Sequence, residues 1–76
     1  MKYIIRYDEF FIIMDTFKQA LNFISVMLTD HENAVFSLFE VEDVREEDDD
    51  ICVYKTKRRY YIDNIQAVED IRNNQD

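Results

Sequence analysis

Glycine and proline are both absent from the 76 residues of this chain. Loops that cradle phosphate groups, and the sharp turns that present a catalytic serine, need glycine because it reaches positive φ without steric cost. Motifs of both kinds are therefore excluded. Turns must instead use aspartate or asparagine, which tolerate left-handed backbone better than other residues do. The candidates are Asp8, Asp30, Asn33, Asp50 and Asn64.

Cysteine occurs once, at Cys52, so the chain cannot form an internal disulfide. A disulfide-stapled secreted scaffold is excluded, and a reducing compartment fits better. The N-terminus lacks the apolar stretch of about 7–15 residues that marks a signal peptide. The longest apolar run, residues 10–14, is far shorter than the roughly 18 residues of a membrane span. We expect a cytoplasmic protein that has no membrane partner.

Basic residues are scarce, because nine lysines and arginines face seventeen aspartates and glutamates and give a formal net charge of −8. A charge of this sign repels the phosphate backbone of nucleic acids and anionic membranes. It favours a basic protein partner, including an enzyme whose own ligand is nucleic acid. We therefore expect no direct nucleic-acid binding and no cofactor.

Large hydrophobic residues are plentiful. A small domain buries only about 60% of the surface that its unfolded chain exposes, so it needs bulky core side chains. Here 47% of the residues are hydrophobic, and six phenylalanines and five tyrosines are among them. Aromatic side chains bury much area for few rotatable bonds. With no linker and no internal repeat, residues 1–76 are expected to form a single domain.

Two short strands are expected at the N-terminus, over 2–7 and 10–14, where aromatic and β-branched residues cluster. Asp8 and Glu9 between them allow a tight hairpin, although this dipeptide matches the preferred hairpin turns poorly. A single bent and bulged strand is the alternative interpretation.

A helix is expected over 16–29, because its apolar residues recur at the three- and four-residue spacing of one helical stripe. Thr16 and Gln19 match a capping box, with a hydroxyl at the N-cap and an amide three residues on. Phe23 and Val26 lie off the stripe, and they either widen the buried face or remain exposed for a partner. The stripe comprises Phe17, Ala20, Leu21, Ile24, Met27 and Leu28.

A second hairpin is expected from strands over 34–44 and 51–62, joined by a charged connection over 45–50. A register with Glu42 opposite Lys55 would put Glu40 opposite Lys57. Opposite charges directly across a sheet contribute about 0.2–1 kcal/mol per pair, which supports this alignment. Strict alternation would then place Cys52, Tyr54, Thr56, Tyr60 and Ile62 on one face with Val35, Phe39 and Val41, and Lys55, Lys57 and Arg59 on the other.

A short terminal helix over 63–73, with Asp63 as its N-cap, completes the pattern. The predicted fold class is α+β: an antiparallel sheet of three or four strands, one central amphipathic helix packed on it, and a short C-terminal helix. Apolar residues occur on both faces of the strands, and one helix covers only one face. The second face must meet the terminal helix, a partner, or another copy of the chain, as in a homodimer.

Eight of the eleven residues from 40 to 50 are acidic, and only Arg45 opposes them. One interpretation is an anionic surface that occupies the nucleic-acid site of another protein, because alternate strand residues repeat at about 6.6 Å, on the scale of phosphate spacing. A solvated loop is the plainer interpretation, and a calcium site would need a glycine that is absent. The predicted partner-binding residues are Glu40, Glu42, Asp43, Glu46, Glu47, Asp48, Asp49 and Asp50, with Tyr54, Tyr60 and Tyr61 as neighbouring anchors.

The one basic stretch, over 55–61, interleaves lysine and arginine with tyrosine, a pattern that can bind single-stranded nucleic acid. A cross-strand charge ladder with the preceding acids is the more ordinary interpretation. His31, Cys52, Ser25 and Ser37 lack the spacing of a metal site or of an activated nucleophile. We therefore expect no catalytic residues and no metal ligands, and the chain is predicted not to be an enzyme.

In size, acidity and aromatic content, the chain resembles the small inhibitors that phages and mobile elements encode, namely anti-CRISPR, anti-restriction and DNA-mimic proteins. The resemblance lies in composition over the whole chain. It implies a rigid, cofactor-free domain in the host cytoplasm that blocks the nucleic-acid site of a defence nuclease, or its assembly. The alternative is a structural or self-assembling module, such as a homodimer or a phage morphogenesis subunit.

Overall fold

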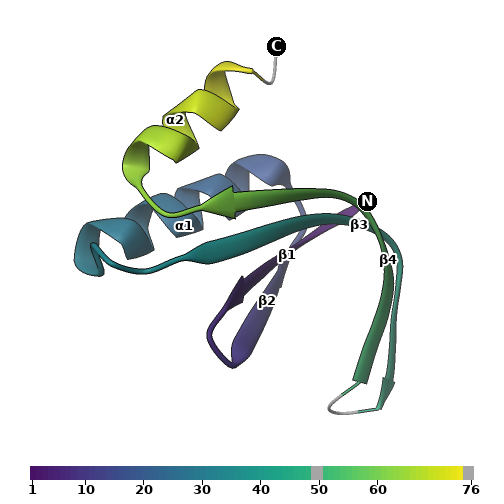
Figure 1. Cartoon of the computed structure of the whole chain (residues 1–76). Helices are drawn as coiled ribbons and strands as arrows, with labels where there is room; N and C mark the ends of the chain where they lie inside the picture. Colours follow the sequence, from purple (N-terminus) through teal and green to yellow (C-terminus); the bar gives the residue numbers. More distant parts are fainter. Residues whose placement is uncertain (49–50, 75–76) are drawn as a thin grey trace.

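The described residues of the chain fold into one four-stranded antiparallel sheet with two helices (Figure 1). The computed structural model describes residues 1–48 and 51–74, and it describes only the backbone at residue 10 and over 43–44, 46–48 and 51–52. The sheet order is β2-β1-β3-β4. This arrangement confirms the predicted α+β class, with four strands. The elements are β1 (Lys2–Tyr7), β2 (Phe10–Met14), α1 (Phe17–Asp30), β3 (Phe36–Asp48), β4 (Ile51–Ile62) and α2 (Ile65–Asn73).

The N-terminal strands form a tight hairpin, and the alternative of a single bulged strand is wrong. β1 and β2 pair antiparallel, with Tyr7 opposite Phe10 at the turn. Asp8 makes this turn possible because it adopts a φ of 56°. Aspartate visits that left-handed region more readily than most residues, so the turn forms without glycine.

Helix α1 follows its predicted pattern. The Thr16 side chain accepts a hydrogen bond from the Gln19 amide at 3.1 Å, which caps the first turn as expected. Val26 is 64% exposed, whereas Phe23 packs against the core, so the two off-stripe residues differ. Of the predicted stripe, Ala20, Leu21, Ile24 and Leu28 are buried and Phe17 and Met27 are half-buried.

The β3–β4 register confirms one predicted pair and corrects the other. Glu42 lies opposite Lys55 as predicted, but Glu40 lies opposite Arg58. Lys57 is the extra residue of a β-bulge, and a bulge switches the side-chain alternation of its strand. The prediction assumed unbroken alternation along β4, so its division of the β4 side chains between the two faces is wrong. Thr56 shares a face with Arg59, and Ile62 lies opposite Phe36 on the other face.

β3 is longer than predicted. The stretch 45–50 was expected to be a connection, yet β3 runs to Asp48 and stays paired with β4 through two further irregularities. Backbone pairing with the β-prone start of β4 outweighs the low strand propensity of aspartate and glutamate. The result is a long two-stranded ribbon that bends away from the helices (Figure 1).

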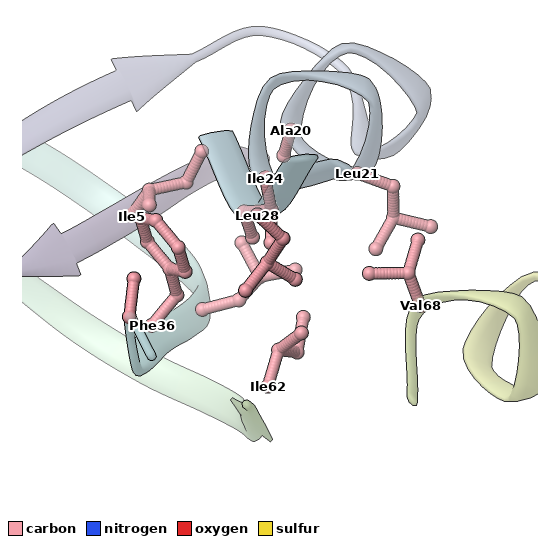
Figure 2. Close-up of a cluster of buried hydrophobic side chains, with 10 residues drawn as sticks. Ile5, Ala20, Leu21, Ile24, Leu28, Phe36, Ile62 and Val68 are labelled. Carbon is pink, nitrogen blue, oxygen red and sulfur yellow. The ribbon is translucent and has the colours of Figure 1, made fainter. Parts of the chain in front are cut away.

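Both helices cover the same face of the sheet, which we call the helix face. Figure 2 shows α1 side chains meeting Ile5, Phe36 and Ile62 from the strands and Val68 from α2. Arg72 of α2 also donates to the Asn22 side chain of α1 at 2.6 Å. The terminal helix therefore packs beside α1 and leaves the opposite face, the open face, without a helix in the part of the chain that the structure describes.

The start of α2 corrects a detail of the sequence analysis. The predicted N-cap was Asp63, but the helix begins at Ile65 with Asn64 as its N-cap. The Asn64 side chain accepts from the Ala67 amide at 2.8 Å, which satisfies one of the free amide groups of the first turn. Asp63 and Asn64 are both common N-cap residues, so the sequence alone did not decide which of the two caps the helix.

Candidate functional site

The far end of the β3–β4 ribbon, residues 43–53, is the most strongly charged part of the chain, and we call it the hairpin tip. It contains six acidic residues and one arginine, a formal charge of −5 out of −8 for the whole chain. β4 places apolar residues, and no cations, opposite the described acidic stretch of β3. The register pairs are Arg45 with Val53, Glu46 with Cys52, and Asp48 with Ile51.

The base of the ribbon is electrically balanced. Lys57 Nζ lies 3.6 Å from Glu42 Oε1. Glu40 lies opposite Arg58, whose guanidinium donates to the Tyr60 hydroxyl at 3.3 Å. This hydrogen bond, together with the negative charge of Glu40, raises the pKa of Arg58. The predicted site residues Glu40 and Glu42 therefore have cationic neighbours of their own.

The remaining predicted acids are known at the level of the backbone or lie outside the described residues. Asp43, Glu46, Glu47 and Asp48 are part of β3, and their side chains are not among those described. Asp49 and Asp50 lie outside the described residues, as does the side chain of Cys52, which was predicted to share a face with Tyr54 and Thr56. Charge and register, rather than side-chain contacts, therefore define the hairpin tip.

The three predicted tyrosine anchors do not form one group. Tyr60 lies on the helix face, where its ring centroid is 5.5 Å from that of Phe17. Tyr61 lies on the open face and is 67% exposed. Tyr54 belongs to the bent ribbon, and its ring centroid is 6.5 Å from that of Phe39. Tyr60 is a packing residue, so only Tyr54 and Tyr61 remain available as anchors.

Tyr3 continues the aromatic packing on the helix face. Its ring centroid lies 5.3 Å from that of Phe17, which in turn contacts Tyr60. Burial raises the pKa of the Tyr3 hydroxyl, and the negative charges of Glu40 and Tyr60 raise it further. This cluster anchors the start of α1 to the sheet.

The open face contains a shallow pocket that the sequence analysis missed. It has a volume of about 300 Å³ and contains two arginines, Arg6 and Arg59. The Arg59 guanidinium carbon lies 5.4 Å from the centre of the Phe39 ring. Neither arginine forms an ion pair with a described side chain. We call this site the arginine pocket, and its lining residues are Arg6, Asp8, Val35, Ser37, Phe39, Arg59 and Tyr61.

A second hollow, of about 560 Å³, lies where α1 and α2 meet, between Phe17, Leu21 and Arg72. Its arginine is already occupied, because Arg72 donates to Glu69 at 3.1 Å and to Asn22 at 2.6 Å. The bond to Asn22 joins the two helices, and the bond to Glu69 lies within α2. The hollow is therefore part of the contact between α1 and α2. The arginines of the open face, in contrast, remain available to a ligand.

The described residues include no group of three or more histidine, cysteine, aspartate or glutamate side chains that could hold a metal ion. His31 is exposed and forms the C-cap of α1, where its amide donates to the Met27 carbonyl at 2.8 Å. Within the described ranges, no helix is long and apolar enough to cross a membrane.

Comparison of the chain with known protein families, with characterised proteins and with solved structures finds no match.

Proposed function

We propose that the chain is a non-enzymatic cytoplasmic inhibitor or modulator that binds a basic protein surface through its hairpin tip. The target that fits best is the nucleic-acid site of a host enzyme, such as a defence nuclease, because such sites present lysine and arginine to phosphates. In this proposal the tip carboxylates take the place of phosphates. This is the mode of action that the compositional resemblance to anti-CRISPR and DNA-mimic proteins implies.

The separation of charge along the ribbon is the observation that carries the proposal. At the base, Glu42 is paired with Lys57 and Glu40 lies opposite Arg58. At the tip, a formal charge of −5 lies on a segment whose second strand supplies apolar partners. An unbalanced field on a protruding segment attracts a cationic surface and accelerates the encounter with it.

The test replaces the five most distal acids with their amides, in the changes Glu46→Gln, Glu47→Gln, Asp48→Asn, Asp49→Asn and Asp50→Asn. The wild-type chain is expected to capture a nucleic-acid-binding protein from a lysate of the host at low salt. Purified separately, that protein should lose its nucleic acid when the chain is added. The variant with all five substitutions, which we call the tip variant, should capture much less of the protein and displace much less of its nucleic acid.

A matched control neutralises five exposed acids away from the tip, so it has the same net charge as the tip variant. These acids are Glu9, Asp30, Glu32, Asp63 and Asp70. The control variant is expected to capture the protein as the wild-type chain does. Equal losses in the two variants would show that overall charge, rather than the hairpin tip, governs binding, and would contradict the proposal.

A self-assembling module is the second candidate, because the open face exposes large apolar side chains. Phe11, Val35 and Tyr61 are 47%, 43% and 67% exposed on that face. Exposed apolar patches mark interfaces, and a two-fold dimer would bury this face against its own copy. Sedimentation at increasing concentration tests this candidate, and a monomer at every concentration would remove it.

A further inference from the structure

We propose that the open face is a binding surface for single-stranded nucleic acid, centred on the arginine pocket. The sequence led us to expect that acids of the neighbouring strand neutralise the basic stretch over 55–61. They do so for Lys57 and Arg58, which lie beside Glu42 and Glu40. They do not do so for Arg59, because the bulge at Lys57 places Arg59 on the open face.

The sheet register places stacking rings at both ends of one cross-strand row and a cation between them. Arg6 pairs with Phe11 on one side and with Ser37 on the other, and Ser37 pairs with Tyr61. The row Phe11–Arg6–Ser37–Tyr61 thus crosses all four strands, a span of about 14 Å at the usual strand spacing. Ser37 is the smallest residue of the row, so the surface is hollow above it, between Arg6 and Tyr61.

The chemistry of this row fits a base and a phosphate together. Tyr61 is 67% exposed and Phe11 is 47% exposed, so each ring can stack on a base. Arg6 and Arg59 supply guanidinium groups that bind phosphate oxygens in a fork geometry, and Ser37 and Tyr61 add hydroxyl donors. An acidic peptide would use the cations alone and would leave the exposed rings without planar partners. The rings therefore favour nucleic acid.

The net charge of the chain does not prevent this binding. Arg59 is six residues from Val53 on β4, about 20 Å along the strand, and Phe39 is four residues from Asp43 on β3, about 13 Å. At physiological ionic strength the Debye length is about 8 Å, so most of the tip field is screened at the pocket. The nearest opposing charge is Asp8, which lines the pocket itself.

The experiment measures the fluorescence anisotropy of labelled oligothymidylates of increasing length at low salt. We expect saturable binding with a dissociation constant of about 100 µM or tighter, weakened by added salt. Arg59→Gln should weaken binding about tenfold. Tyr61→Ala should weaken it about five- to hundredfold, as the removal of one stacking ring does, whereas Tyr61→Phe should retain it. Asp8→Asn, which keeps a residue suited to the left-handed turn, should tighten it.

The control is Lys18→Gln, which removes one positive charge from an exposed residue of α1, on the helix face. It should bind the oligonucleotide like the wild-type chain. Three results would overturn the proposal: no saturable binding, equal losses in Lys18→Gln and Arg59→Gln, or equally strong competition by oligoglutamate, which would identify an acidic peptide as the ligand. The tip variant should bind the oligonucleotide at least as tightly as the wild-type chain does. Loss of partner capture and loss of oligonucleotide binding can therefore be told apart.

Discussion

Arg58 and Arg59 are adjacent in the sequence and lie on opposite faces of the sheet, as successive residues of a strand do. Arg58 lies on the helix face, opposite Glu40, and donates to the Tyr60 hydroxyl. Arg59 lies on the open face, over the ring of Phe39. The bulge at Lys57 switches the alternation of β4, so it decides which arginine takes part in packing and which is available to a ligand.

Ile24 is the residue on which the packing of α1 depends most directly. It is fully buried and belongs to the cluster that joins α1 to the sheet (Figure 2). We expect Ile24→Ala to lower the free energy of unfolding by about 2–5 kcal/mol, because it leaves a cavity in the core. Val26→Ala on the same helix should change it by less than about 0.5 kcal/mol, since Val26 is largely exposed. Urea unfolding followed by circular dichroism measures both, and similar losses would contradict the packing described here.

The raised pKa of Tyr3 predicts a loss of stability at alkaline pH. Burial, with the charges of Glu40 and Tyr60, makes the folded chain hold this proton more tightly than the unfolded chain does. The stabilisation is complete below the unfolded value of about 10 and is lost as the pH rises through the folded value. Stability should therefore fall more steeply above pH 10 in the wild-type chain than in Tyr3→Phe. Parallel stability curves for the two chains would contradict this prediction.

At the level of elements, the sequence predicted what depends on local pattern. The apolar spacing of α1 and its Thr16 cap were correct, and both predicted hairpins are present. The extension of β3 to Asp48 and the bulge at Lys57 were not predicted. Both are properties of pairing between strands, which depends on the partner strand and on the packing of the whole sheet. Patterns within one strand carry no signal for them.

The cap of α2 offers an element-scale test with a neighbouring control. Asn64→Ala should lower the free energy of unfolding by about 1 kcal/mol, because the Ala67 amide loses its acceptor. Asp63→Ala should have a much smaller effect, since Asp63 lies before the cap. Thermal unfolding of the two variants decides between them. A larger loss for Asp63→Ala would restore the N-cap that the sequence first suggested.

At the scale of the whole molecule, the sequence identified the acidic stretch and the basic stretch over 55–61, but it did not indicate the pocket that Arg59 forms with Arg6. Six acidic residues follow one another closely at the hairpin tip, so composition alone reveals them. Arg6 and Arg59 are far apart in the chain, and only the pairing of β1 and β4 with β3 brings them to one pocket. Their meeting depends on topology and on the bulge, and neither can be read from spacing.

The fold thus separates two surfaces of opposite charge. The helices occupy one face of the sheet, the arginine pocket lies on the other, and the hairpin tip extends beyond both at the end of the bent ribbon (Figure 1). The main core cluster lies on the helix face under α1, and Ile4 and Val41 are buried on the opposite side of the sheet. Substitutions of the exposed pocket and tip side chains leave both groups in place.

The salt dependence of affinity for the captured nucleic-acid-binding protein tests the central claim most directly. Exposed ion pairs contribute about 0.2–1 kcal/mol each, so neutralising Glu46, Glu47 and residues 48–50 should weaken binding at least about fivefold at low salt. The wild-type affinity should fall steeply as salt rises, and that of the tip variant should change little. Equal affinities with parallel salt dependence in the two chains would contradict charge-led binding through the hairpin tip.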